Sequence, residues 1–84
     1  MNSKFKSEDI LTVDLHNMKT AEAKKFLEMY VERAPKEVKE IVVIHGYRRG
    51  QSLLNMVRKD FKSNRVKRKF LSLNQGVTSL ILAA

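Results

Sequence analysis

The feature that most constrains the fold is a repeated unit in which an apolar segment ends in a histidine and a turn-forming residue. The first unit, LTVDLHN, occupies residues 11–17, and the second, IVVIHG, occupies residues 41–46. A segment with helical periodicity follows each unit. Parallel strands joined by a helix finish at the same edge of a sheet. The repeat therefore predicts an α/β fold in which Asp14, His16 and His45 lie near one crevice.

The periodicity of the whole chain predicts the order βαβαββ. Strands are expected over residues 11–16, 41–44, 66–73 and 77–82, and helices over residues 20–34 and about 51–63. Thr20 is expected to cap the first helix and Pro35 to stop it, while Asn64 is expected to end the second. In the first strand, Asp14 and His16 share the polar face.

Core positions and one turn follow from the same pattern. The first helix is expected to bury a stripe that includes Phe26, Leu27 and Tyr30. In the final hairpin, Gly76 is available for a positive φ angle. The inner stripe of the second helix is expected to consist of Leu53, Leu54, Val57 and Phe61.

The length and composition favour a single domain with a short arm. The chain has 84 residues, of which 43% are hydrophobic and 31% are charged, and we expect residues 1–9 to form a flexible arm ahead of a domain over 10–84. The absence of cysteine excludes disulfides, thiolate nucleophiles and cysteine zinc sites. No secretory signal and no apolar stretch of roughly 20 residues are found, so we expect a cytoplasmic protein with no membrane partner.

The positive charge is concentrated in the second part of the chain. Residues 1–34 contain six Lys or Arg and six Asp or Glu, whereas residues 35–84 contain eleven and three, which accounts for the net charge of +8. A basic surface of this kind suits a polyphosphate, an anionic lipid or an acidic protein. The basic run consists of Arg58, Lys59, Lys62, Arg65, Lys67, Arg68 and Lys69.

Three motifs resemble those of the Smr (small MutS-related) domain family. Residues 13–17, VDLHN, resemble the Leu-Asp-Leu-His-Gly strand end of the family. Residues 45–50, HGYRRG, resemble its His-Gly-x-Gly-x-Gly loop, and residues 76–78, GVT, resemble the Gly-Val-Thr that opens its last strand. Two residues depart from the pattern. Asn17 replaces a glycine but tolerates the left-handed region, and Arg48 replaces the middle glycine of the loop.

The resemblance implies a fold and an activity. The implied fold is a two-layer α/β sandwich, with two helices on one face of a mixed four-stranded sheet, similar to the C-terminal domain of a bacterial translation initiation factor. Members of the family bind nucleic acid, and several are endonucleases that nick DNA or cut RNA, including messenger RNA on stalled ribosomes. This chain resembles a stand-alone member of the family.

These observations nominate two groups of functional residues. Asp14, His16 and His45 are the candidate catalytic residues, because imidazoles near neutral pH transfer protons and a carboxylate orients them. The other group is expected to hold the phosphate backbone or stack on a base. Its members are Gly46, Tyr47, Arg48, Arg49, Gly50, Arg65, Lys67, Arg68 and Lys69.

Several alternatives stay open from the sequence. No metal-ligating set is predicted and no small-molecule cofactor is expected, although a divalent cation such as Mg or Mn held by Asp14 and a substrate phosphate is conceivable. Metal-free cleavage of RNA through the ribose 2′-hydroxyl is equally open. The main alternative to an endonuclease is a non-catalytic DNA- or RNA-binding module that acts with a partner protein. A protein-interaction domain with an acidic partner is the third.

Overall fold

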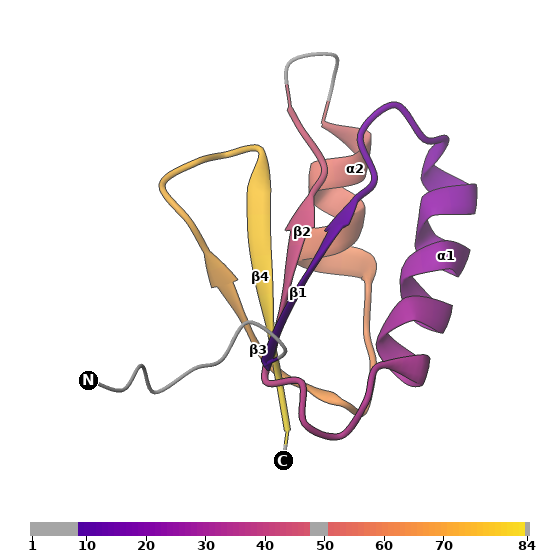
Figure 1. Ribbon diagram of the computed structural model, residues 1–84. Coiled ribbons are helices and arrows are strands. Elements are labelled where there is room, and N and C mark those ends of the chain that lie inside the picture. Colours follow the sequence, from indigo (N-terminus) through magenta and orange to yellow (C-terminus); the bar gives the residue numbers. More distant parts are fainter. Residues whose placement is uncertain (1–8, 48–50, 84) are drawn as a thin grey trace.

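The computed structural model of the chain describes residues 9–47 and 51–83. Its strands form one mixed sheet with the spatial order β1-β2-β4-β3, and both helical segments lie on the same side of this sheet (Figure 1). This arrangement confirms the predicted two-layer βαβαββ fold. The elements are β1 (Ile10–Asp14), α1 (Thr20–Arg33), β2 (Glu40–Ile44), α2 (Ser52–Asn55), η2 (Met56–Asp60), β3 (Val66–Leu71) and β4 (Val77–Leu82).

The pairing of the strands brings distant parts of the sequence together at one edge. Strand β1 pairs in parallel with β2, and β4 pairs in antiparallel fashion with both β2 and β3. Asp14 lies opposite Ile44, and Ile44 lies opposite Val77. The carboxyl ends of β1 and β2 therefore meet the start of β4, as expected for the parallel unit.

The core fills the space between the sheet and the helices. Alternate residues of each inner strand point toward α1 and η2, as a two-residue period requires. This confirms that Val13 and Leu15 belong to the apolar side of the first strand. The fully buried side chains include Leu15, Leu27, Val31, Ile41, Val43, Met56, Val57, Phe61, Thr78 and Leu80.

Helix α1 differs from the prediction at its start and on one face. It begins at Thr20, and the residue before it, Lys19, provides no side-chain cap, so the prediction that Thr20 caps the helix is wrong. Phe26 is 44% exposed and does not belong to the core. The buried stripe of the helix is Ala23, Leu27 and Val31. These residues recur every four positions, and Phe26 lies about 100° around the helix from Leu27.

The second helical segment is shorter than predicted because its last turn widens. Residues 56–60 form a π-type turn, in which the Phe61 N–H donates to the Met56 carbonyl at 2.7 Å. Phe61 is already extended, so the helix ends at Asp60, before the expected breaker Asn64. The wider turn places Met56 in the core, while Leu54 is half-buried.

Two side chains of the basic run hold the ends of helices. The Arg65 guanidinium donates to the carbonyls of Val31 at 2.8 Å, in the last turn of α1, and of Ala34 at 2.6 Å, just after it. The Lys69 ammonium donates to the carbonyls of Arg58 and Phe61, at the end of η2. Cations stabilise the carbonyl ends of helices, so these two charges contribute to the fold.

We predict that Arg65→Met lowers the free energy of unfolding by roughly 2 kcal/mol, because charged hydrogen bonds to the carbonyls at the end of α1 are lost. Arg68→Met, at an exposed position of the same strand region, should change it by less than about 0.5 kcal/mol. Urea denaturation followed by circular dichroism measures both. Equal effects of the two substitutions would contradict the capping role of Arg65.

Candidate active site

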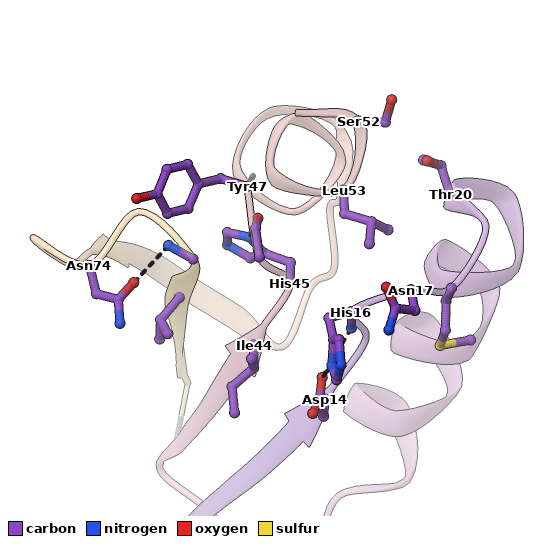
Figure 2. Close-up of a pocket in the computed structure, with 14 residues that line it drawn as sticks. Asp14, His16, Asn17, Thr20, Ile44, His45, Tyr47, Ser52, Leu53 and Asn74 are labelled. Atoms are coloured by element: carbon purple, nitrogen blue, oxygen red, sulfur yellow. Dashed lines mark hydrogen bonds and ion pairs between the residues drawn. The ribbon is translucent and has the colours of Figure 1, made fainter. Parts of the chain in front are cut away.

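An open pocket of about 730 Å³ lies where β1, β2 and β4 meet. Asp14, His16 and His45 all line it, which confirms that the two strand ends share one crevice (Figure 2). The pocket is lined by Asp14, His16, Asn17, Met18, Thr20, Ile44, His45, Gly46, Tyr47, Ser52, Leu53, Asn74, Gly76 and Val77.

Asp14 and His16 form a bonded pair on the exposed rim of this pocket. One carboxylate oxygen of Asp14 accepts from the His16 backbone N–H at 3.0 Å and also contacts the His16 Nδ1 atom. The side chains of His16 and Asp14 are 55% and 49% exposed. The hydrogen bond from the His16 side chain, followed by the one from its backbone, lowers the pKa of Asp14. The carboxylate therefore holds a proton on Nδ1, and Nε2 is left as the reactive nitrogen.

The turn after this pair depends on Asn17. Asn17 has a φ of 72°, which is the left-handed conformation expected for the residue that replaces a glycine. The Met18 N–H closes the turn by donating to the Leu15 carbonyl at 3.0 Å. The chain can thus leave β1 sharply, and His16 stays at the rim while Leu15 is buried.

His45 lies in a different environment from His16, since only 2% of it is exposed. Its Nδ1 donates to the Gly46 carbonyl at 2.8 Å, which leaves Nε2 to accept from the Thr78 hydroxyl, also at 2.8 Å. The Arg58 guanidinium donates to the same hydroxyl oxygen at 2.7 Å and to the Val77 carbonyl at 2.9 Å. Burial lowers the pKa of His45, and the nearby positive charge of Arg58 lowers it further. The hydrogen bond to Gly46 opposes these two effects but is outweighed by them.

The hydrogen bonds around His45 select one arrangement of protons. Thr78 accepts from Arg58 and donates to His45, and His45 donates to Gly46. A protonated His45 would have to donate from both nitrogens, and the Thr78 hydroxyl would then lose the acceptor of its own proton while receiving two cationic donors. The structure therefore holds His45 as a neutral imidazole with a defined tautomer. The hydrogen bond from His45 to the Gly46 carbonyl positions the backbone that directly follows β2.

Arg58 and Thr78 are site-supporting residues that the sequence reasoning did not link to His45. In the sequence, Arg58 is one member of the basic run and Thr78 is part of the Gly-Val-Thr motif. A threonine on the apolar face of a strand, facing a histidine at the end of its neighbour, is a signal that could have suggested the pair. The link needs the β2–β4 pairing, which places Val43 opposite Thr78.

Two glycines allow the backbones of the loop and the hairpin to touch. The N–H groups of His45 and Gly46 both donate to the Gly76 carbonyl, at 2.9 and 3.0 Å. A Cβ atom on Gly76 would lie 3.4 Å from the Gly46 Cα atom. Among the described residues, Gly46 is the glycine with positive φ, at 76°, so the expectation for Gly76 is wrong. The same Cβ atom on Gly76 would lie 3.3 Å from the Asn74 Oδ1 atom, so a side chain at position 76 would be tightly packed, and Asn74 Oδ1 accepts the Gly76 N–H at 2.8 Å.

The residues nominated for nucleic-acid contact are distributed unevenly. Tyr47 lines the pocket and is 38% exposed, whereas Arg48, Arg49 and Gly50 lie outside the described residues. Lys67 and Arg68 are exposed on β3. Arg65 and Lys69 are only half-buried, but their charged groups bind the helix ends described above. Burial and the nearby Lys62 charge also lower the pKa of Lys69.

The described part of the chain does not form a metal-binding cluster. Asp14 is the one carboxylate that lines the pocket, and no group of three or more potential His, Cys, Asp or Glu ligands occurs in residues 9–47 or 51–83. These residues do not by themselves fit a resident divalent cation. Within the same ranges, no helix is long and apolar enough to cross a membrane.

Comparison with known proteins places the sequence and its fold in a family. The sequence model of the Smr domain family matches residues 13–78. The chain therefore belongs to this nucleic-acid-binding family. The Smr domain of Thermus thermophilus MutS2 is structurally similar, with a TM-score of 0.78 and 22% sequence identity. The match covers 88% of this chain and 99% of that domain, which establishes the shared fold. No curated protein sequence matches the chain.

We predict that His45 makes the fold less stable in mild acid. The unfolded chain takes up a proton on His45 near its ordinary pKa of about 6.5, while the folded chain resists it. The free energy of unfolding should therefore fall as the pH drops through this value and below it. In a His16→Ala background, where His45 is the one histidine left, urea denaturation between about pH 7.5 and 5.5 measures this slope. An unchanged slope after the further change His45→Gln would contradict the assignment.

We predict that the Asp14 carboxyl titrates below its ordinary pKa of about 3.9 and that His16→Ala raises the midpoint, because its largest cause is removed. NMR observation of the side-chain carboxyl carbon during an acid titration measures both midpoints. A midpoint that is the same with and without His16 would show that the pair does not form in solution.

Proposed function

We propose that this Smr domain is an endonuclease that cleaves a phosphodiester bond of RNA or DNA at the Asp14–His16 pair. The observation that carries the proposal is an exposed carboxylate–imidazole pair at the rim of a pocket, in a domain of a nucleic-acid-binding family. The net charge of +8 would attract the polyphosphate substrate. His45 joins Asp14 and His16 in the proposed site, but as a positioning residue.

We propose separate roles for the two members of the pair, and their hydrogen bonds support this division. Asp14 stays ionised at neutral pH and keeps the proton of His16 on Nδ1, so that Nε2 acts as the general base. On RNA, Nε2 would take the proton of a 2′-hydroxyl, whose oxygen bonds to phosphorus as the bond to the 5′-oxygen breaks. The departing 5′-oxygen then takes a proton from water. On DNA, which lacks the hydroxyl, a water molecule would be the nucleophile.

The surroundings of the pair would hold the substrate backbone. Gly46 lines the pocket, but its N–H is bonded to the Gly76 carbonyl and its carbonyl to His45, so it positions the backbone there, and Tyr47 offers an aromatic face beside it. We assign phosphate contacts to Arg48, Arg49 and Gly50 of the same loop. Lys67 and Arg68 would extend the contact along β3, and their exposure supports this role.

The runner-up is a binding module that docks RNA or DNA without cutting it. The burial of His45 supports this alternative, because a single exposed imidazole remains at the described site to serve both as base and as acid. In that case the pocket would bind a phosphate through the protonated His16, and cleavage would fall to a partner protein.

Cleavage assays on labelled single- and double-stranded RNA and DNA, with and without EDTA, separate the two functions. We expect Asp14→Asn and His16→Ala to lower the cleavage rate by roughly 100-fold or more, the usual contribution of a general base, while binding persists. Glu28→Gln, an exposed change on α1 away from the pocket, is the matched control and should cleave like the wild type.

Trace cleavage of equal size in the wild type and both site variants would identify a contaminant and leave the binding module. Binding that does not weaken as salt increases would contradict phosphate contact altogether. Loss of both binding and cleavage in His16→Ala, with a normally folded protein by circular dichroism, would show that the pair binds substrate without separate evidence for catalysis.

A further inference from the structure

The sheet has an open face opposite the helices, and the strand pairing defines which side chains belong to it. Thr78 and Leu80 point toward the helices, so Val77, Ser79 and Ile81 of β4 point to the other side. Paired residues share a face, and no described helix or strand covers this one. The remaining members of the open face are Ile10, Thr12, Asp14, Glu40, Val42, Ile44, Arg68 and Phe70.

Phe70 is the aromatic group of this face, and it is 60% exposed. It lies opposite Ser79, and Arg68, also exposed, lies on the same face opposite Ile81. Lys67 is exposed at the irregularity of the β3 strand between Val66 and Arg68. An aromatic ring on a sheet, beside cationic side chains, is the combination that holds an unpaired base and its phosphate.

The chemistry of the face favours a single strand as its occupant. In one common RNA-binding module, aromatic rings on the open side of a four-stranded sheet stack on the splayed bases of single-stranded RNA. A paired duplex keeps its bases stacked inside and cannot offer one to Phe70. The half-buried aliphatic side chains Val42, Ile44 and Val77 would lie under the bases, and the exposed Thr12 hydroxyl is available to the backbone, whereas Ser79 is buried in the middle of the row. Glu40 is the acidic member of the face besides Asp14.

The open face is continuous with the candidate active site. Thr12, Val42, Ser79 and Phe70 form one row across the four strands. Asp14, Ile44 and Val77 form the next row on the same face, and all three line the pocket. Phe70 is thus three strand spacings, or about 14 Å, across the sheet from the strand that carries Asp14. A single strand can span this distance with a few nucleotides.

We infer that the open sheet face is a stacking platform for single-stranded nucleic acid, in which Phe70 stacks on a base and Arg68 holds its phosphate. The strand then leads across the sheet to Asp14 and His16. The inference rests on the proposed function only for what happens at the Asp14 end. The platform itself selects unpaired over paired nucleic acid.

The test is fluorescence-anisotropy binding of a short labelled pyrimidine oligonucleotide and of the same oligonucleotide in a fully paired duplex. Phe70→Leu should weaken binding of the single strand by roughly tenfold and leave duplex binding unchanged, because one stacked base is lost. Phe70→Tyr should restore single-strand binding. The matched control is Leu71→Ala, a 57% exposed neighbour on the opposite face, which should bind like the wild type.

Equal single-strand binding by Phe70→Leu and the wild type would overturn the inference, as would an equal loss in Leu71→Ala. A Phe70→Leu effect that coincides with a change from dimer to monomer in sedimentation would assign the face to a second copy and also overturn it. His16→Ala, measured both in these binding assays and in the cleavage assays described above, keeps the two proposals apart. If His16→Ala cleaves like the wild type while Phe70→Leu loses single-strand binding, the proposed catalysis fails and the platform stands. If His16→Ala loses cleavage while Phe70→Leu binds like the wild type, the platform alone is overturned.

Discussion

The architecture of the site depends on the hydrogen-bonded chain that runs from Arg58 through Thr78 and His45 to Gly46. It joins the π-type turn, the start of β4 and the residues that directly follow β2, which are three separate segments of sequence. Each of the four residues in this hydrogen-bonded series is buried or half-buried, and each of its polar groups in the series has a partner. Removing one member would leave another buried group unsatisfied, so the loop, the hairpin and the helix are held as a unit.

The two histidines show how one motif can serve two physical purposes. Both follow an apolar strand, and both reach the same pocket. His16 lies one residue past buried Leu15 and is exposed beside a carboxylate, whereas His45 is enclosed by β4 and by the guanidinium of Arg58. A paired, exposed imidazole is suited to proton transfer, and an enclosed neutral one is suited to holding a backbone. The pocket therefore combines a reactive rim with a rigid floor.

The basic residues of the chain also serve two different purposes, since some stabilise the fold and others are exposed. The basic run includes Arg58, Arg65 and Lys69 as well as Lys67 and Arg68. The charged groups of the first three bind backbone carbonyls or a buried hydroxyl. A net charge counts all of them equally. Fewer cations than the net charge suggests are exposed to an anionic partner, and on β3 these are Lys67 and Arg68, close to Phe70. This is why the open face of the sheet, and not the helical side, is the region of β3 that suits a nucleic acid.

The sequence by itself determined the order of the elements, the single α/β domain and the pairing of Asp14 with His16, because these follow from local periodicity and from residues two apart on one strand. Only the tertiary structure decided the burial of His45, the engagement of Arg58 and Arg65, and the role of Gly76. Those outcomes depend on contacts between residues some 30 positions apart, such as His45 with Thr78 and Arg65 with Ala34. A local pattern carries no information about which distant group satisfies a buried polar atom, since that is settled by the packing of the sheet against its helices.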